Sequence, residues 1–169
     1  FVPGTSFLMM SRNEKLVDGG VDEEGTPSSL FWKIDFIHRH LPEWLLPKMF
    51  RKALHFGNRH NGATIDGEST TAAFSVGDRR TAVFLDEFSR IKDGYDILAG
   101  SADVTRCRIF NFTPWGVGNA AYKLAMRKDV RKLRLHWSDH PQKGRGLYRY
   151  VPATCKVEPE TPVLGPPGI

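Results

Sequence analysis

Residues 80–92 read RTAVFLDEFSRIK, and the fold can be worked out from this stretch outward. Thr81 to Leu85 form a continuous apolar run, which is typical of a strand buried on both faces. Asp86 and Glu87 follow at once. In ATP-hydrolysing P-loop proteins with this pattern, the first carboxylate holds a magnesium ion, usually through water, and the second orients the attacking water. The same residues also fit an exposed acidic pair that precedes a helix, where negative charge is favourable.

On either side of this stretch, apolar strands alternate with helices. Strands are expected at 7–10, 106–112 and 130–137, and helices at 30–40, 87–103 and 119–128. The apolar face of the first helix is expected to hold Leu30, Ile34, Phe36, Ile37 and Leu41. Residues 52–69 are expected to form a hairpin around Asn61-Gly62. This alternation predicts an α/β fold with a mostly parallel sheet, covered on both faces, whose ligands gather at the carboxyl ends of the strands.

A second apolar strand, Arg106 to Phe112, also ends in polar groups. Asn111 and Thr113 lie there, about twenty residues beyond the acidic pair. In ATPases of this architecture, the strand beside the acidic pair supplies a polar residue that senses the terminal phosphate. The same residues fit a plain turn at a strand end, with Pro114 and Gly116 as ordinary turn residues.

Length and composition exclude several classes of protein. The chain has 169 residues, with 24 Lys and Arg against 19 Asp and Glu, a formal charge of +5. That length suits one domain. No apolar run approaches the about 20 residues of a membrane-spanning helix, so no membrane partner is expected. Two cysteines exclude a disulfide framework, and we expect Cys107 and Cys155 to be free thiols, with Cys107 in the core.

Two segments together resemble a family of DNA-packaging motors. Residues 80–92 are similar to the Walker B region of the large terminase subunits of tailed bacteriophages, and RIFNFTPWGVGNAAY (108–122) is similar to that family's motif III. NGATIDGESTTAAF (61–74) and KLRLHWSDHP (132–141) also resemble the family and occur in the same order. The resemblance covers roughly residues 6–150 and implies a RecA-like P-loop NTPase core that uses ATP and Mg²⁺.

The resemblance also implies roles for single residues. Asp86 would be the magnesium-associated carboxylate and Glu87 the catalytic glutamate. Thr113 would belong to the motif that couples hydrolysis to DNA movement, beside the sensing residue Asn111. The 169 residues contain no G-x-x-x-x-G-K-[ST] phosphate-binding loop. In the family this loop precedes the strand that we place at 7–10, so we expect it before Phe1, and we expect this chain alone not to turn over ATP.

Other positions depart from the family pattern. Phe112 stands where a small hydroxyl residue is usual. Family members often carry an arginine before the Walker B strand that acts on a neighbouring subunit's nucleotide, and that position falls on Val76. Arg79 and Arg80 lie nearby and are candidate arginine fingers, although both also fit a solvated basic turn.

A basic stretch follows the second motif. Between Tyr122 and Tyr150 there are nine Lys and Arg against two Asp. Lys132 and Arg134 are expected on one face of a strand, and Lys143 and Arg145 follow. Charge without base-reading groups suits a protein that holds DNA regardless of sequence, but a solvated face explains the same residues.

We therefore interpret the chain as part of a large terminase ATPase domain, incomplete because the phosphate-binding loop is absent. Residues 1–150 would belong to that domain, and 151–169, with five prolines, would form a linker or disordered tail. The parent would package double-stranded DNA in the infected bacterial cytoplasm, transiently at the procapsid portal. Its partners would be sister subunits in a ring, the portal protein and a small terminase subunit. A fragment of another nucleic-acid ATPase, such as a helicase, and a non-enzymatic DNA-binding module are the alternatives.

Overall fold

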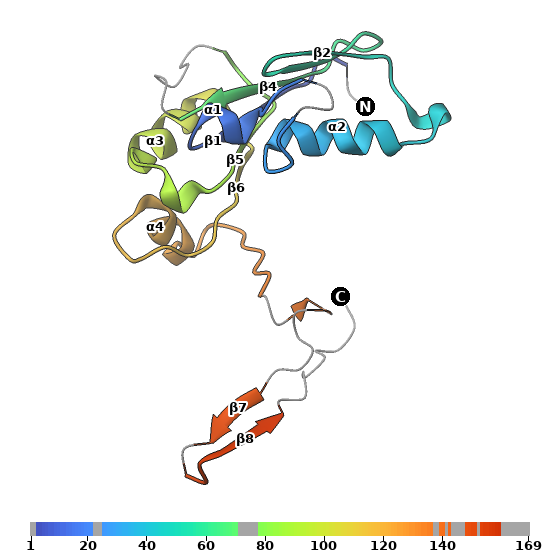
Figure 1. Cartoon of the computed structure of the whole chain (residues 1–169). Coiled ribbons are helices and arrows are strands. Elements are labelled where there is room, and N and C mark those ends of the chain that lie inside the picture. The colour runs from blue at the N-terminus through green and yellow to red at the C-terminus, as the bar shows by residue number, and fades with distance from the viewer. Residues whose placement is uncertain are drawn as a thin grey trace. The chain divides into compact units, whose positions relative to one another are not determined.

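The computed structural model describes residues 3–21, 25–70, 78–136, 139–140, 142, 148–151 and 153–159. The chain groups into two compact units, residues 1–127 and 128–169. The first contains the main sheet (Figure 1), and the second contains an antiparallel pair, β7 (Tyr148–Val151) and β8 (Lys156–Pro159). Strand β8 lies in the segment expected as a linker or tail.

The main sheet has six strands in the order β2-β3-β4-β1-β5-β6. Strand β1 pairs in parallel with both β4 and β5, and β5 pairs in parallel with β6. The pairs β2–β3 and β3–β4 are antiparallel. The strands are β1 (Ser6–Ser11), β2 (Met49–Lys52), β3 (His55–Asn58), β4 (Thr64–Ser69), β5 (Ala82–Leu85) and β6 (Arg108–Phe110). The expected mixed α/β fold with a mostly parallel sheet is confirmed.

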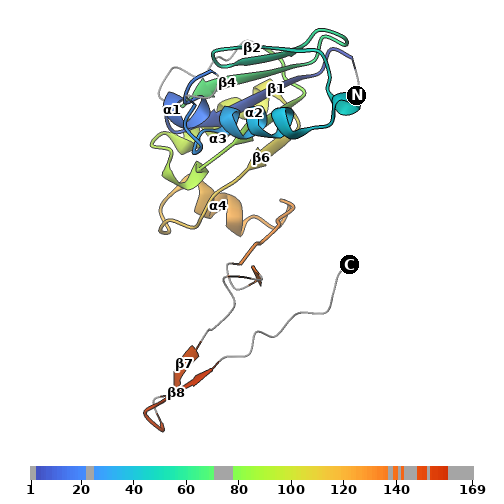
Figure 2. The ribbon, with the colours of Figure 1, turned by 45° about the vertical axis from the view of Figure 1, so that its right-hand side comes forward.

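Helices cover both faces of this sheet (Figure 2). The helices are α1 (Glu14–Val17), α2 (Leu30–His40), α3 (Gly94–Val104) and α4 (Ala120–Met126), with 3₁₀ turns η1 (Glu43–Leu45) and η2 (Phe88–Arg90). Helix α2 begins where the Ser29 hydroxyl accepts a hydrogen bond from the Trp32 N–H, 3.2 Å away. Helix α3 starts later than residue 87 because η2 intervenes.

Side chains alternate between the two faces of the central strands, as strand geometry requires. On one face, Met9 and Phe84 pack against a core cluster of Val17, Phe31 and Phe56. On the other face, the strand residues Leu8, Met10, Val83 and Leu85 are at most 4% exposed. Because one face of β1 and β5 is fully buried and the other packs in part against the core cluster, the ends of these strands are held at fixed positions.

The predicted hairpin is confirmed. Strands β3 and β4 are joined by a tight loop in which the Asn58 N–H donates to the Ala63 carbonyl at 2.8 Å. Gly62 has φ +69°, a conformation that glycine adopts without steric cost.

The predicted apolar face of α2 is partly wrong. Leu30 and Phe31 are buried, but Phe36 and Ile37 are 44% and 59% exposed. The first turn of α2 faces Phe56, with which Phe31 stacks at 5.4 Å between ring centroids. Ile34, one turn further on, still packs against the same core cluster, so the buried side of α2 holds residues 30, 31 and 34 and leaves out 36 and 37.

Two other predictions are also corrected. The expected strand at 130–137 is absent from its described part, because residues 131–136 belong to no strand and Leu133 is 85% exposed. Apolar alternation alone does not make a strand, which needs a partner for its backbone groups. Cys107 is an exposed free thiol instead of a core residue, because β6 is short and begins after it.

A buried charge network ties α1, α2 and β2 together. The Arg51 guanidinium contacts Asp18 at 2.8 Å and Asp35 at 3.4 Å, and it stacks on the rings of Phe31 and Phe56. The side chain of Asp18 is 4% exposed, and its second oxygen accepts the Leu54 N–H at 2.6 Å. Burial pushes the pKa of Asp18 up, but Arg51 and the backbone donors outweigh this and hold it below 3.8. At Asp35 burial dominates and raises the pKa.

We predict that Asp18→Asn lowers the free energy of unfolding by roughly 3 kcal/mol at pH 7, because Arg51 loses its buried counter-charge. The pKa of Asp18 is lower in the folded chain than in the unfolded one. Its stabilisation is therefore present above pH 3.8 and is lost as the pH falls through the folded pKa. Urea unfolding across pH should show the deficit shrinking below pH 3.8. Asp103→Asn, at an exposed position of α3, is the control. A deficit that stays constant with pH would contradict this account.

Candidate active site

Three parallel strands bring their carboxyl ends to one edge of the sheet. In the register of β1, β5 and β6, Met10 pairs with Leu85 and Leu85 pairs with Phe110. The residues that follow each strand therefore lie side by side. Arg12 follows β1, Asp86 and Glu87 follow β5, and Asn111 follows β6.

Backbone hydrogen bonds continue past the strand ends. The Asp86 N–H donates to the Met10 carbonyl at 2.8 Å, and the Asn111 N–H donates to the Leu85 carbonyl at 2.8 Å. The Asn111 carbonyl in turn accepts the Phe88 N–H at 3.1 Å. The backbone around the acidic pair is therefore fixed on both sides.

The structure brings Asn111 and Asp86 into direct contact. Asn111 Nδ2 donates to Asp86 Oδ1 at 2.7 Å. Asp86 is half-buried, while Asn111 is exposed. This bond orients one carboxylate oxygen toward β6 and leaves the second oxygen for another ligand.

Glu87 adopts an unusual backbone conformation. Its φ is 50° and its ψ is 34°, in the left-handed region that residues with a β-carbon seldom occupy. Such a conformation costs of order 1 kcal/mol and is concentrated at functional sites. It turns the chain sharply after Asp86, so that the two carboxylates point to different partners.

Arg12 is the partner of Glu87, and sequence reasoning missed it. Arg12 Nε lies 2.8 Å from Glu87 Oε2, and the side chains are 42% and 39% exposed. The available signal was a charged residue directly after a buried strand, in the run Met10-Ser11-Arg12. The pairing itself depends on β1 and β5 being neighbours, which the sequence alone did not specify.

The segment after β6 is anchored to η2. The Ser89 hydroxyl donates to the Thr113 carbonyl at 2.7 Å, and the ring of Phe88 packs against Phe110 and Phe112. Thr113 is thus held through its carbonyl, while its side chain is exposed. Phe112, which departs from the family pattern, contributes to this packing.

Arg79 and Arg80 lie before β5, at the opposite end of that strand from Asp86. The Arg80 guanidinium pairs with Asp66 on β4 and lies 3.7 Å from Asp78. His55 Nδ1 also contacts Asp66, at 2.5 Å. Arg79 is exposed.

The donor set suits a metal ion that arrives with a phosphate ligand. Asp86 and Glu87 supply two carboxylates beside the Asn111 amide. Among the residues that the structure describes, no group of three or more His, Cys, Asp or Glu could hold a metal ion. Mg²⁺ is commonly bound by one or two carboxylates together with substrate phosphates, so the residues present fit it.

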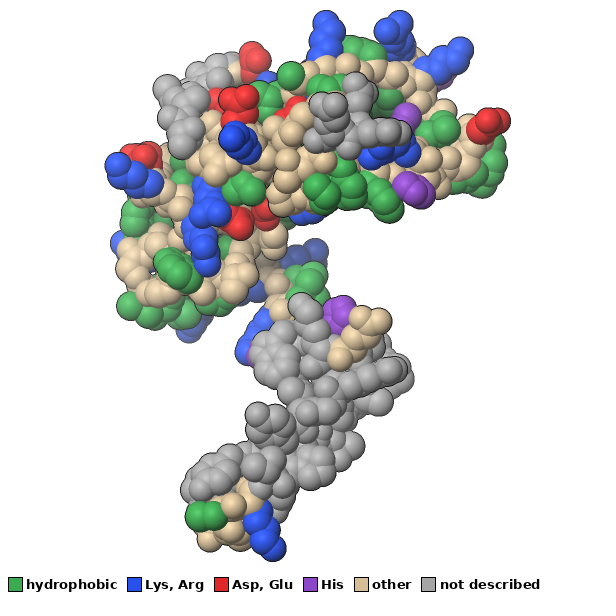
Figure 3. All heavy atoms as spheres, viewed as in Figure 1, with side chains coloured by type: hydrophobic (Ala, Val, Ile, Leu, Met, Phe, Trp, Pro, Cys, Tyr) green, Lys and Arg blue, Asp and Glu red, His purple; other side chains and the backbone are tan. Residues whose placement is uncertain are grey.

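Of the four candidate DNA contacts, two lie within the described residues. Lys132 and Arg134 are exposed in a segment of the second unit that has neither helix nor strand. Lys143, Arg145 and Val76 lie outside the described residues. In Figure 3, basic side chains on the visible face of the first unit are interspersed with acidic ones.

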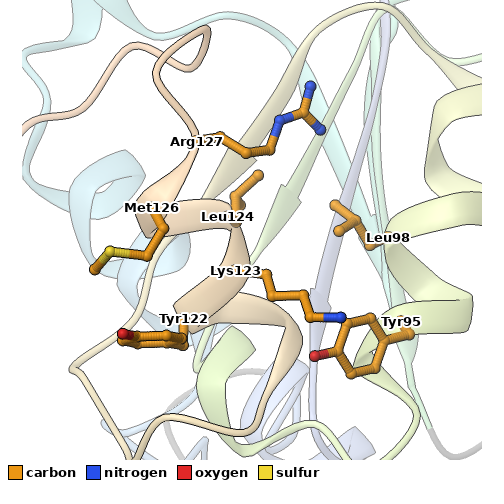
Figure 4. A pocket seen from close by; sticks show the side chains of 7 residues that line it. All are labelled: Tyr95, Leu98, Tyr122, Lys123, Leu124, Met126 and Arg127. Carbon is orange, nitrogen blue, oxygen red and sulfur yellow. The ribbon is translucent and has the colours of Figure 1, made fainter.

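A shallow surface pocket lies between α3 and α4 (Figure 4). Lys123 reaches toward Tyr95, with its Nζ 4.8 Å from the ring centroid. The lining contains none of the carboxylates of the acidic pair. The lining residues are Tyr95, Leu98, Tyr122, Lys123, Leu124, Met126 and Arg127.

Comparison with solved structures finds similarity to a terminase domain. The ATPase domain of the large terminase from Thermus phage P74-26 aligns with a TM-score of 0.45 and 12% sequence identity. The alignment covers 68% of this chain and 49% of that one, so this chain spans about half of that domain. No family model and no curated protein matches the sequence. Within the described residues, no helix is long and apolar enough to cross a membrane.

Proposed function

We propose that this chain is part of a nucleotide-hydrolysing DNA-packaging motor of the large terminase class, with a RecA-like core. The observation that carries the proposal is the 2.7 Å hydrogen bond from Asn111 to Asp86. It joins the two segments on which the sequence resemblance rests, Walker B and motif III. A chance acidic pair before a helix would not require this contact with the next strand.

The residues divide the chemistry between them. Asp86 would hold Mg²⁺ of a bound Mg·ATP, usually through water, and Asn111 would keep that carboxylate oriented. Glu87 would orient and polarise the attacking water, once its carboxylate is available. Magnesium, when present with ATP, supplies neutralisation of the phosphate charge. Thr113, fixed to η2 through Ser89, would transmit changes at the site to the following loop.

The same resemblance supports the proposed partners. Sister subunits in a ring, a portal protein and a small terminase subunit would assemble with the parent in the infected bacterial cytoplasm. Arg79 is the better candidate to reach a neighbour's nucleotide, because Arg80 is already paired with Asp66 and Asp78. Double-stranded DNA is the proposed cargo.

We predict that the chain binds Mg·ATP weakly and that Asp86→Ala lowers this affinity about tenfold, the loss expected for a metal-holding carboxylate. Binding of ATP without Mg²⁺ should not change. Equilibrium titration with a fluorescent ATP analogue measures both. Asp103→Ala removes an equal charge from an exposed site on α3 and should leave both affinities unchanged. If Asp86→Ala and Asp103→Ala behave alike, the acidic pair is not a metal site.

One observation favours a second role, sequence-independent DNA binding. Lys128, Arg131, Lys132 and Arg134 are all exposed, and Asp129 is the one acidic residue among residues 128–134. Exposed cations that follow one another along the chain can each neutralise a phosphate. This role would persist without any nucleotide hydrolysis, as in the DNA-binding module considered above.

We predict that replacing Lys132 and Arg134 together by Gln reduces the slope of log affinity for duplex DNA against log salt by about 2, because each contact contributes about 0.9. Fluorescence anisotropy over a salt series measures the slope. Replacing Lys33 and Lys52, both exposed, by Gln removes the same charge and should leave the slope unchanged. An equal effect of the two pairs would mean that net charge, and not this segment, holds DNA.

A further inference from the structure

We infer that Arg12 is a positioning residue for Glu87, which holds the catalytic carboxylate while nucleotide is absent and moves to the terminal phosphate when Mg·ATP binds. This inference rests on the proposed function and deepens it. Arg12 lies directly after β1, and Glu87 directly after β5, on neighbouring parallel strands. Both are therefore at the sheet edge where the phosphates would lie.

The contact between Arg12 and Glu87 is close but poorly directed. Arg12 Nε and Glu87 Oε2 are 2.8 Å apart, yet Oε2 accepts no well-aligned hydrogen bond in the structure. The pair is therefore a charge contact rather than the two-pronged pairing of which a guanidinium is capable. The Arg12 side chain is 42% exposed, so solvent reaches the guanidinium, while Glu87 Oε2 is itself buried. A single, poorly directed contact therefore holds the pair.

The backbone at Glu87 allows its side chain to change partners. Glu87 keeps its left-handed conformation next to a backbone that hydrogen bonds fix on both sides. The turn therefore determines where the carboxylate begins, and rotation of the side chain determines which group it meets. A change of partner at Glu87 needs no movement of the strand.

A second polar group at the end of β1 also has an unusual environment. The Ser11 side chain is fully buried, and its hydroxyl oxygen has no hydrogen-bond partner within the described chain. An unpaired buried hydroxyl is costly unless something else satisfies it. Ser11 immediately precedes Arg12, so the unpaired hydroxyl and the arginine occur on successive residues at one strand end, with side chains on opposite faces.

A phosphate is a stronger partner for Arg12 than Glu87 is. A terminal phosphate offers several charged oxygens in a geometry that a guanidinium can grip with two parallel hydrogen bonds. Glu87 offers one poorly aligned contact. When the phosphate takes Arg12, Glu87 loses its counter-charge and its carboxylate becomes available to a water molecule. Hydrolysis would thereby be coupled to the presence of the third phosphate.

The test compares the affinities for ATPγS and ADP, each with Mg²⁺, by equilibrium titration. We expect Arg12→Gln to lower the affinity for ATPγS about tenfold and to leave the affinity for ADP unchanged, because only ATPγS has the third phosphate. The affinity of Arg12→Lys for ATPγS should lie between those of the wild type and Arg12→Gln, since lysine keeps the charge but lacks the planar guanidinium. Glu87→Gln should raise the affinity for ATPγS several-fold, because Arg12 no longer has a charged partner in the chain. The double variant should show no such gain.

Arg106→Gln is the matched control, an exposed arginine between α3 and β6. Equal weakening of ATPγS and ADP by Arg12→Gln would make Arg12 merely structural and would overturn the inference. So would a Glu87→Gln gain that persists in the double variant. If the wild-type chain binds neither nucleotide, the weak Mg·ATP binding predicted above is contradicted, and this role of Arg12 fails with it. If the wild-type chain binds both and Arg12→Gln leaves their ratio unchanged, this role alone fails.

Discussion

The parallel pairing of β1 with both β4 and β5 is the constraint on which the rest of the first unit depends. It places β1 inside the sheet, paired along both of its edges, with its carboxyl end beside that of β5. The ladder continues beyond the strands through Asp86 and Asn111, whose N–H groups bind the Met10 and Leu85 carbonyls. Three segments far apart in sequence are thereby brought together, and they supply every side chain of the candidate active site.

Local strain and charge are concentrated at this edge. Glu87 in a left-handed conformation, its single contact with Arg12 and the Ser11 hydroxyl, which has no partner among the described residues, all occur at the carboxyl ends of two neighbouring strands. The buried charges around Arg51 are held more firmly than those at this edge. Asp18 and Arg51 form a close pair with additional backbone donors, which suits stability. The loosely held charges at the strand ends suit an exchange of partners.

Sequence patterns predicted the features that depend on residues close together in the chain. The apolar run into Asp86, the polar end of the next strand at Asn111 and the Asn61-Gly62 turn each follow from neighbouring residues, and the structure has all three. Arg12 could not be assigned, because its role depends on which strand lies beside β5. The burial of Cys107 and the strand at 130–137 were predicted from apolar pattern alone. Each failed where the fold offers no covering layer or partner strand to the described residues.

The most direct test of the proposed site is paramagnetic broadening of the amide signals of the isotope-labelled chain by Mn²⁺ with ATP. Mn²⁺ substitutes for Mg²⁺ at oxygen ligands, and broadening reports proximity even when binding is weak. If the strand ends form one nucleotide site, signals from Arg12, Asp86 to Phe88 and Asn111 should broaden together, and Asp86→Ala should abolish this. Broadening spread evenly over exposed acidic residues such as Asp96 and Asp103, and unaffected by Asp86→Ala, would contradict it.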